Sequence, residues 1–257
     1  MPTLSAIADH LDRLLRTREI PDYPSALNGV QLENQGEIVK VAAAVDFSRR
    51  IVEQTVSSRA NLLIVHHGMF WSGLRPLTGQ FYARIAPLIR HDIAVYASHL
   101  PLDCHPELGN NALLARELGL EPKGGFARFQ NIDVGVQGET EIATTALLDR
   151  VRAVSTRHKG AAIASSISDS RMTRHWAICT GAGADAATLR EATEAGIDTL
   201  IVGEGPHYTA VDAADAELAI IYAGHYATET FGVQALTAHV SDEFGLPWTF
   251  LEAPTGL

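Results

Sequence analysis

The chain has 257 residues, 46% of them hydrophobic, and a formal net charge of −10 at pH 7. This length and apolar content suffice for one large domain or two small ones with a packed core. The negative charge argues against sequence-independent nucleic-acid binding, which needs a surplus of Lys and Arg to displace counterions from phosphate.

Cysteine content and hydropathy indicate the compartment. The two cysteines, Cys104 and Cys179, are too few for a disulfide framework and suit a reducing environment. Residues 1–13 carry acids in a helical pattern rather than a basic patch before an apolar core, and no run of 18 apolar residues occurs. We therefore expect a cytoplasmic protein with no export signal and no membrane partner.

The first half of the chain alternates predicted helices and strands. Helical spacing of apolar residues predicts a helix over 4–15, and Pro21 and Pro24 follow it as a stop. Strands are then predicted at 39–45, 61–65 and 93–97, with a helix over 49–59 between the first two. Asn110 and Asn111 are expected to cap a further helix that ends at Gly119.

The second half repeats this order. It predicts a strand at 176–180, a helix at 187–195, and strands at 199–202 and 218–223. Val95-Tyr96-Ala97-Ser98-His99 aligns without a gap on Ile221-Tyr222-Ala223-Gly224-His225, and the same shift places Asp103 on Glu229. At a second shift, His66-His67-Gly68 aligns on Gly203-Glu204-Gly205.

The duplication predicts an α/β fold made of two related lobes. Each lobe is a β-α-β unit, and the alternation of strands with helices favours mainly parallel sheets. We place the lobes at residues 1–125 and 175–257, and the pattern leaves the assignment of the middle segment, residues 126–174, open to either lobe.

Histidines and acids gather where the predicted strands end. His66 and His67 close one apolar run, and His99 and His225 close two others. Parallel sheets bind ligands outside the carboxyl ends of their strands, so these side chains are expected at a binding cleft between the lobes. Neighbouring side chains in a continuing strand point to opposite faces, so we expect a turn at Gly68 to bring His66 and His67 to one cleft, where they serve two neighbouring ions.

The spacing of the other donors is consistent with a metal site. His225 and Glu229 are four residues apart in a predicted helix and can project from one face, whereas Pro101 predicts a loop between His99 and Asp103. A mixture of imidazole and carboxylate suits zinc, iron, manganese, nickel or cobalt rather than calcium or magnesium. His99 is equally compatible with a ligand and with a residue that hydrogen-bonds a ligand.

Two divalent ions per chain would need a bridging group, and Glu229 is the candidate. Such a pair activates a water and polarises a phosphoryl or carbonyl oxygen, so hydrolysis needs no protein nucleophile. Glu204 and His207 lie at the second-copy position of His66-His67, where they are either parts of a capped loop or a catalytic acid and base facing the substrate. The six other histidines show no such pattern and are expected to be solvated.

Two other polar or glycine-rich stretches carry weaker signals. Asn28-Gly29-Val30-Gln31 is polar among apolar neighbours and is compatible with a simple turn. Gly181-Ala182-Gly183 follows a strand but lacks both the dinucleotide fingerprint and the Gly-Lys-Ser/Thr ending of a phosphate loop. We therefore predict no nucleotide cofactor site from it.

Nearly the whole chain resembles the NIF-three-like family, whose members are often named GTP cyclohydrolase 1 type 2 homologues or dinuclear-metal-centre hexameric proteins. The match is loose only in the middle, at residues 130–174. The matching stretches are Asn28-Gly29-Val30-Gln31-Leu32-Glu33, Ala44-Val45-Asp46, Leu63-Ile64-Val65-His66-His67-Gly68, Ser98-His99 through Asp103, Gly109-Asn110, Gly203-Glu204 with His207, Gly224-His225 with Glu229, and Phe250-Leu251-Glu252.

The resemblance implies two ions held by His66, His67, Asp103, His225 and Glu229, and a ring-shaped homohexamer. It implies no single activity, since members are linked to GTP ring opening, to phosphoester hydrolysis and to iron handling. The leading hypothesis is a metal-dependent hydrolase of a nucleotide-like or phosphorylated small molecule. The alternative is a non-enzymatic protein that handles a metal such as iron, or a partner-binding oligomeric scaffold.

Overall fold

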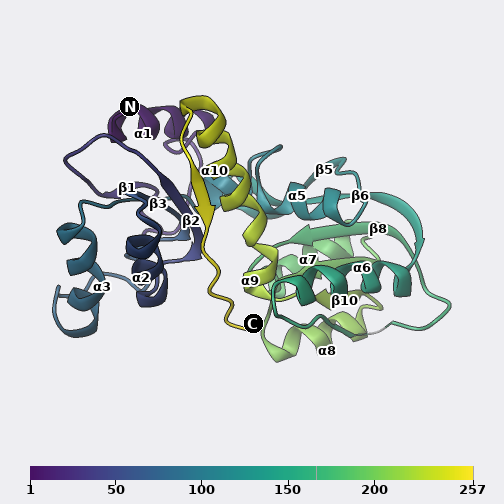
Figure 1. The fold of residues 1–257 in the computed structure, drawn as a ribbon. Helices are drawn as coiled ribbons and strands as arrows, with labels where there is room; N and C mark the ends of the chain where they lie inside the picture. Colours follow the sequence, from purple (N-terminus) through teal and green to yellow (C-terminus); the bar gives the residue numbers. More distant parts are fainter. Residues whose placement is uncertain (166, 257) are drawn as a thin grey trace. The chain divides into compact units, whose positions relative to one another are not determined.

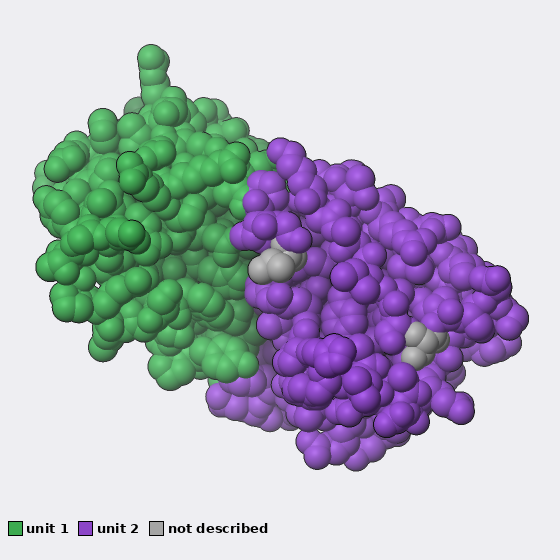
Figure 2. Space-filling view, turned by 90° about the horizontal axis from the view of Figure 1, so that it is seen from below, with its two compact units in different colours: residues 1–102, 232–253 green, residues 103–231, 254–257 purple. Residues whose placement is uncertain are grey.

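A computed structural model describes residues 1–165 and 167–256 and shows an α/β protein with two sheets. The chain divides into two compact units, coloured separately in Figure 2. Unit 1 holds residues 1–102 and 232–253, and unit 2 holds residues 103–231 with the chain from Pro254 onward.

Unit 1 is built on a sheet with the strand order β1-β4-β3-β2-β11. Strands β4, β3, β2 and β11 are parallel to their neighbours, and β1 is antiparallel to β4. Its elements are α1 (Leu4–Leu14), β1 (Gly29–Leu32), β2 (Val41–Asp46), α2 (Arg49–Ser58), β3 (Leu62–His67), α3 (Gly79–Arg90), β4 (Ala94–Ala97), α10 (Thr230–Phe244), which begins just before the unit boundary, and β11 (Trp248–Phe250).

Helices cover both faces of this sheet, with α2 and α3 on one face and α1 and α10 on the other (Figure 1). Alternate strand residues on one face of the sheet, such as Leu63 and Val65, pack with Ile51 of α2 and Leu88 of α3 in one buried cluster. A strand covered on both faces is apolar throughout, which is why the central strands appear in the sequence as continuous apolar runs.

Unit 2 is built on a mixed sheet with the order β5-β6-β8-β9-β10-β7. Strands β8, β9 and β10 are parallel, whereas β5, β6 and β7 pair antiparallel. Its elements are α4 (Leu100–Asp103), which crosses the unit boundary, α5 (Asn110–Glu117), β5 (Gly124–Phe129), β6 (Ile132–Ala143), α6 (Thr144–Arg157), β7 (Ile163–Ser165), β8 (Met172–Cys179), α7 (Ala186–Glu194), β9 (Thr199–Val202), α8 (His207–Asp215), β10 (Ala219–Tyr222) and α9 (His225–Thr228).

The core of unit 2 also lies on both faces of its sheet. One cluster joins Trp176 and Ile201 to Leu147 of α6 and Leu114 of α5, and a second joins Leu200 to Leu189 of α7. The α5 and α6 residues belong to the first cluster and the α7 and α8 residues to the second, so these two pairs of helices cover opposite faces of the sheet. Each unit is therefore a three-layer α/β/α structure.

The two units repeat one another, as the aligned strand ends predict. A helix, an antiparallel edge strand and three parallel strands occur in the same spatial order in each, with α1 and β1–β4 corresponding to α6 and β7–β10. One short helix follows each copy, α4 in the first and α9 in the second. The duplicated α/β architecture is thus confirmed.

The units exchange the elements that follow each copy. Helix α5 follows the first copy but packs on β6 and β8 of unit 2, whereas α10 and β11 follow the second copy and belong to unit 1. Strand β11, which follows the second copy, pairs with β2 of the first copy. Strand β6, which follows the first copy, pairs with β8 of the second copy. Each sheet therefore gains one strand from the chain segment that follows the other copy. This exchange places the unit boundaries away from the ends of the expected lobes, 1–125 and 175–257.

Three local features differ from the sequence expectation. The middle segment forms β5, β6, α6 and β7 of unit 2, and the hairpin between β5 and β6 makes that sheet mixed because a short turn joins only antiparallel strands. Residues 100–103 form a one-turn helix rather than a loop, since Pro101 lies in the first turn, where its missing N–H costs no hydrogen bond. Gly109, not Asn110 or Asn111, is the N-cap residue of α5.

Within residues 1–165 and 167–256, none of the helices combines the length and apolar character needed to cross a membrane.

We expect Trp176→Ala to destabilise unit 2 by about 3–5 kcal/mol, because the side chain is fully buried and its loss leaves a large cavity. Denaturant unfolding followed by circular dichroism measures the change. Ile163→Ala on edge strand β7, where the side chain is 68% exposed, is the control and should change stability by less than about 0.5 kcal/mol. Equal effects of the two substitutions would contradict the proposed core.

Candidate metal centre

Three histidines of unit 1 lie together at the carboxyl ends of two neighbouring parallel strands. His66 and His67 are the last residues of β3, and His99 follows β4. The ring centroids of His66 lie 4.9 Å from those of both His67 and His99, and one nitrogen of each ring lies within 4.8 Å of the others. All three side chains are buried, so their nitrogens form a compact donor group that could hold a metal ion.

Each of these rings is fixed through its Nδ1 atom. Nδ1 of His66 donates to the carbonyl oxygen of Ser98 at 2.8 Å, and Nδ1 of His67 lies 2.8 Å from a carboxylate oxygen of Asp46. Strand β3 lies between β2 and β4, so the two rings are anchored to opposite neighbours, one to the end of each. The chain also turns directly after the two histidines, since the backbone N–H of Trp71 donates to the carbonyl oxygen of Gly68 at 3.4 Å, so the turn that the sequence predicts at Gly68 is present.

His99 is anchored by Asp22, which lies in the segment between α1 and β1. A carboxylate oxygen of Asp22 lies 2.8 Å from Nδ1 of His99, and its other oxygen accepts from the backbone N–H of Leu100. Burial alone would raise the pKa of Asp22, but the hydrogen bonds and charge of His99, with the bond from Asn28, outweigh burial and lower the pKa. The carboxylate therefore stays ionised and can only accept, so Nδ1 carries the proton and Nε2 is available to a ligand.

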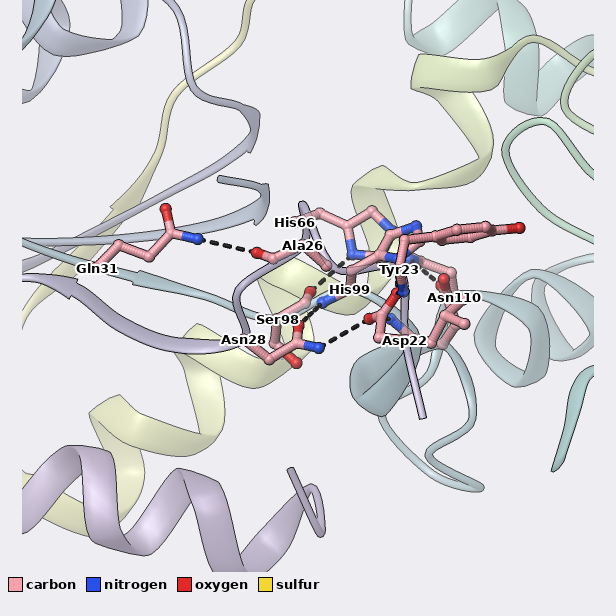
Figure 3. Close-up of polar contacts among 11 residues, drawn as sticks. Asp22, Tyr23, Ala26, Asn28, Gln31, His66, Ser98, His99 and Asn110 are labelled. Carbon is pink, nitrogen blue, oxygen red and sulfur yellow. Dashed lines mark hydrogen bonds and ion pairs between the residues drawn. The ribbon is translucent and has the colours of Figure 1, made fainter. Parts of the chain in front are cut away.

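Asn28 and Gln31 of the polar stretch 28–31 bind the backbone beside the histidines, and Figure 3 shows the bonds of Asn28 to His99 and Asp22. Asn28 accepts from the backbone N–H of His99 at 2.7 Å and donates to Asp22. Gln31 accepts from the backbone N–H of Met69 at 2.6 Å, and a Cβ on Gly68 would come within 2.3 Å of its carboxamide. This stretch is more than a turn, because it fixes the backbone on both sides of the histidine cluster.

Unit 2 presents a second donor group around His225, the first residue of α9. Nε2 of His225 lies 3.0 Å from a carboxylate oxygen of Glu229, and Nδ1 lies 2.7 Å from a carboxylate oxygen of Glu204. The predicted four-residue spacing thus brings His225 and Glu229 into contact. Glu204, which aligns on His67, contacts the residue that aligns on His99, so the repeat extends to side-chain contacts.

The charge state of His225 follows from these contacts. Burial on its own lowers the pKa of His225, but the hydrogen bonds and negative charges of Glu229 and Glu204 outweigh burial and raise the pKa to about 9. The imidazole is therefore protonated at neutral pH in the metal-free chain. Nε2 must give up this proton before it can ligate an ion, so ligand binding here is coupled to proton release.

Gly181 makes room for Glu229. Its φ angle is +62°, and a Cβ at this position would lie 2.1 Å from Oε1 of Glu229 and 3.6 Å from Nε2 of His225. Its backbone N–H donates to Oγ1 of Thr228 at 3.1 Å. Gly181 is thus explained by the approach of a carboxylate, and Gly183 by that of the Cys179 carbonyl oxygen, rather than by a phosphate loop.

Asp103 is the last residue of α4 and is buried. Its Oδ1 accepts from the side chain of Asn110 at 2.8 Å. The neighbouring Asn111 donates to the carbonyl oxygen of Val134 and accepts from the backbone N–H of Thr180, next to Gly181. The two asparagines therefore hold Asp103 and the backbone before Gly181 in place instead of capping α5.

The two expected catalytic residues differ in environment. Glu204 holds His225 in place and is 42% exposed, so its observed contact is that of a positioning residue. His207 is exposed at the start of α8, and within the described residues its side chain has no recorded hydrogen bond or ion pair. The catalytic assignment of both stays a prediction, as does the gathering of His66, His67, Asp103, His225 and Glu229 in one cleft.

The donor chemistry fits transition-metal binding. His66, His67, His99 and His225 each have Nδ1 bonded to a carbonyl or carboxylate oxygen, the arrangement that fixes the orientation and tautomer of metal-binding histidines. Cys179 does not add a thiolate, because burial, followed by the charges of Asp103 and Asp185, raises the pKa of its thiol. The donors are therefore imidazole and carboxylate, as the sequence predicts.

Several of the remaining histidines have structural contacts rather than solvated positions. His10 and His239 hydrogen-bond to each other through Nε2 at 2.8 Å and stack with centroids 5.1 Å apart, which ties α1 to α10. Nδ1 of His105 accepts from the backbone N–H of Leu108. The expectation of solvated rings is wrong for these three, because their partners come from turns and neighbouring helices rather than from a periodic pattern.

Comparison with known proteins gives a consistent assignment. A family model described as Duf34/NIF3 (NGG1p interacting factor 3) matches residues 2–255. The chain belongs to this family.

Its relatives include proteins named GTP cyclohydrolase 1 type 2 homolog. That of Deinococcus radiodurans is 40% identical over 96% of this chain and 92% of its own length, and that of Halobacterium salinarum is 38% identical over 98% and 99%. Among solved structures, protein ybgI, described as of unknown function, matches with a TM-score of 0.89 and 30% identity over 99% of this chain and all of its own. TTHA1606 from Thermus thermophilus matches with a TM-score of 0.82 and 34% identity over 98% and 99%.

We expect Asp22→Asn to weaken metal binding by roughly 10–100-fold, because the carboxylate that fixes His99 loses its charge. Isothermal titration of the metal-free protein with Zn²⁺ or Mn²⁺ measures the affinity. Asp9→Asn, on an exposed position of α1 in the same unit, is the matched control and should bind as the wild type does. Unchanged affinity in Asp22→Asn would argue against a role of His99 at the metal centre.

Two glycine substitutions separate backbone strain from loss of the site. Gly181→Ala and Gly196→Ala both place a side chain at positive φ, +62° and +67°, and each should cost about 1–2 kcal/mol of stability. A Cβ on Gly196 meets nothing within 4 Å, whereas a Cβ on Gly181 displaces Glu229. We therefore expect only Gly181→Ala to lose bound metal, measured by elemental analysis after reconstitution, and equal metal contents would contradict the placement of Glu229.

Proposed function

We propose that the chain binds two divalent metal ions and hydrolyses a nucleotide-like or other phosphorylated small molecule. His66 and His67 from unit 1, with Asp103, His225 and Glu229 from unit 2, are the proposed ligands, and His99 lies beside the first two. The observation that carries the proposal is the anchoring of Nδ1 in every histidine of the set, which leaves Nε2 of each directed away from its anchor.

Chain connectivity supports a single centre formed by both donor groups. The chain passes from unit 1 to unit 2 between residues 102 and 103 and returns between residues 231 and 232. His99 and Asp103 flank the first crossing within one helical turn, and Glu229 lies just before the second. Covalent structure therefore keeps one donor of each group, His99 and Asp103, close at the first crossing.

A bound ion pair would supply an activated water and would polarise the scissile phosphoryl or carbonyl oxygen. The chain's own carboxylates position the ligands, since Asp22, Asp46 and Glu204 hold the imidazoles in one orientation. Glu204 is 42% exposed and Asp46 is 36% exposed, so both carboxylates are also accessible to a proton on a substrate or solvent molecule. No serine, threonine or cysteine nucleophile is required.

The substrate class rests on the relatives. Those of Deinococcus radiodurans and Halobacterium salinarum carry the name GTP cyclohydrolase 1 type 2 homolog, and hydrolysis of a purine nucleotide is compatible with a dinuclear centre. We accordingly place GTP first among the candidate substrates, followed by other nucleotides and simple phosphoesters.

The test is turnover by purified, metal-loaded protein against a panel of nucleotides and phosphoesters. His66→Ala and Glu229→Gln each remove a proposed ligand, so we expect activity to fall by at least about 100-fold, in line with losses seen when a catalytic group is removed. Asp9→Asn serves as the control with wild-type activity. Equal residual turnover of wild type and both variants on every substrate would contradict a hydrolase.

Metal content distinguishes the non-enzymatic alternative. If the wild type holds two ions per chain and both variants hold fewer, yet no substrate turns over, the protein handles or stores metal instead. Fewer than one ion per chain after reconstitution would contradict the metal centre itself. The homohexamer stays a prediction, and light scattering of the purified chain measures its mass.

A further inference from the structure

Two exposed aromatic rings lie beside the buried histidines of unit 1. The Trp71 ring centroid is 4.5 Å from that of His99 and 4.7 Å from that of His67, and Tyr23 is 6.1 Å from His99. Tyr23 and Trp71 are 6.5 Å apart with their planes at 85°. Yet Tyr23 is 50% exposed and Trp71 is 36% exposed, so both offer ring surface to solvent at the edge of the donor group.

The exposed rings are not required by the hydrophobic core. Phe70, the residue before Trp71, faces inward and packs against the core at Phe81, with ring centroids 6.4 Å apart. Trp71 instead leaves that core and rests on two imidazoles. Large exposed apolar side chains that lie next to one another on a soluble surface are characteristic of a binding site.

The groups that anchor the histidines also fix these rings. Tyr23 follows Asp22, and its backbone N–H donates to the Asp22 carboxylate that holds His99, at 2.7 Å. Trp71 follows the Gly68-Met69 segment that Gln31 holds, and its backbone N–H donates to the carbonyl oxygen of Gly68 at 3.4 Å. The positions of the rings and of the metal donors are therefore set together, as recognition and reaction of one molecule require.

The loop after β3 and helix α3 also carry positive charge. Arg75 lies 4.5 Å above the Phe81 ring and Arg84 lies 5.9 Å from it. Within the part of the chain that the structure describes, neither arginine has a recorded ion pair with a carboxylate. In a protein with a net charge of −10, this positive charge in the same unit favours a ligand that carries an anionic group.

We propose that Tyr23 and Trp71 form a stacking subsite for the purine or similar planar base of the ligand. The inference rests on the proposed function and concerns recognition of the base, the part of the substrate that the metal donors do not select. Aromatic side chains stack on every base through the π-face, so the subsite favours ring-bearing ligands over ringless phosphates with little discrimination between bases. Both residues are specificity determinants and take no part in proton transfer.

The test compares binding of GTP and of inorganic tripolyphosphate, which lacks a base, to metal-loaded wild type, Tyr23→Ala and Trp71→Ala. We expect the GTP dissociation constant to rise roughly 5- to 150-fold in each variant, the range set by loss of one stacking contact. Tripolyphosphate affinity and metal content should stay within about twofold. Trp71→Phe, which keeps an aromatic face, should retain most of the GTP affinity.

Leu74→Ala is the matched control, because Leu74 lies in the same loop and is 94% exposed. It should change neither affinity. Equal loss of GTP and tripolyphosphate, loss of metal, or no change in either variant would overturn the subsite, and so would wild-type protein that binds GTP no more tightly than tripolyphosphate.

Binding is measured independently of turnover, so the two proposals fail separately. If GTP binds through the two rings but nothing is hydrolysed, the stacking subsite stands and the hydrolase does not. If ringless phosphoesters are hydrolysed and the ring substitutions change nothing, the hydrolase stands and the stacking subsite does not.

Discussion

The Nδ1 hydrogen bonds of the four candidate ligand histidines are the constraint on which the rest of the site depends. A carbonyl or carboxylate oxygen accepts each bond, at 2.7–2.8 Å, so each imidazole has Nδ1 committed to the protein. This commitment lets the three buried imidazoles of unit 1 lie with ring centroids 4.9–5.6 Å apart without competing for the same protons. It also explains why polar residues far from the donors in sequence, such as Asp22 and Asn28, belong to the site.

The duplicated fold places three of these anchors, Asp46, Ser98 and Glu204, at or just after the ends of parallel strands. In each unit, three parallel strands end at one edge, and a one-turn helix follows the third strand. The ends of neighbouring strands therefore lie one hydrogen bond apart, which is how Ser98 reaches His66 and Asp46 reaches His67. The copies have diverged in charge: where the first carries His67 near His99, the second carries Glu204 bonded to His225. One unit thus offers mainly imidazole and the other adds carboxylate.

Exchange of the elements after each copy connects the fold to the site. Because α5 packs in unit 2 and α10 mostly in unit 1, the chain crosses between units at the last residue of α4 and at the start of α10, three residues after α9. Those two short helices carry His225 and Asp103, and Glu229 follows α9 directly. Glu229 is tightly packed within unit 2, as the close approach of Gly181 shows.

The amino-acid sequence by itself determined the central parallel strands of each copy, the internal repeat and the placement of histidines and acids at strand ends, because burial on both faces leaves a continuous apolar run that stops where the strand stops. The edge strands β1 and β7, the hairpin of β5 and β6, and β11 lack such a run and were not predicted. The sequence also indicated imidazole and carboxylate donors. Only the tertiary structure decided which acid anchors which histidine, that α5 and α10 change units, and that Trp71 and Tyr23 border the donors. His99 and Asp22 are 77 residues apart, and Asp22 lies in an irregular segment, so no periodic pattern records their contact. Side-chain direction in such segments is set by distant packing and hydrogen bonds rather than by local spacing.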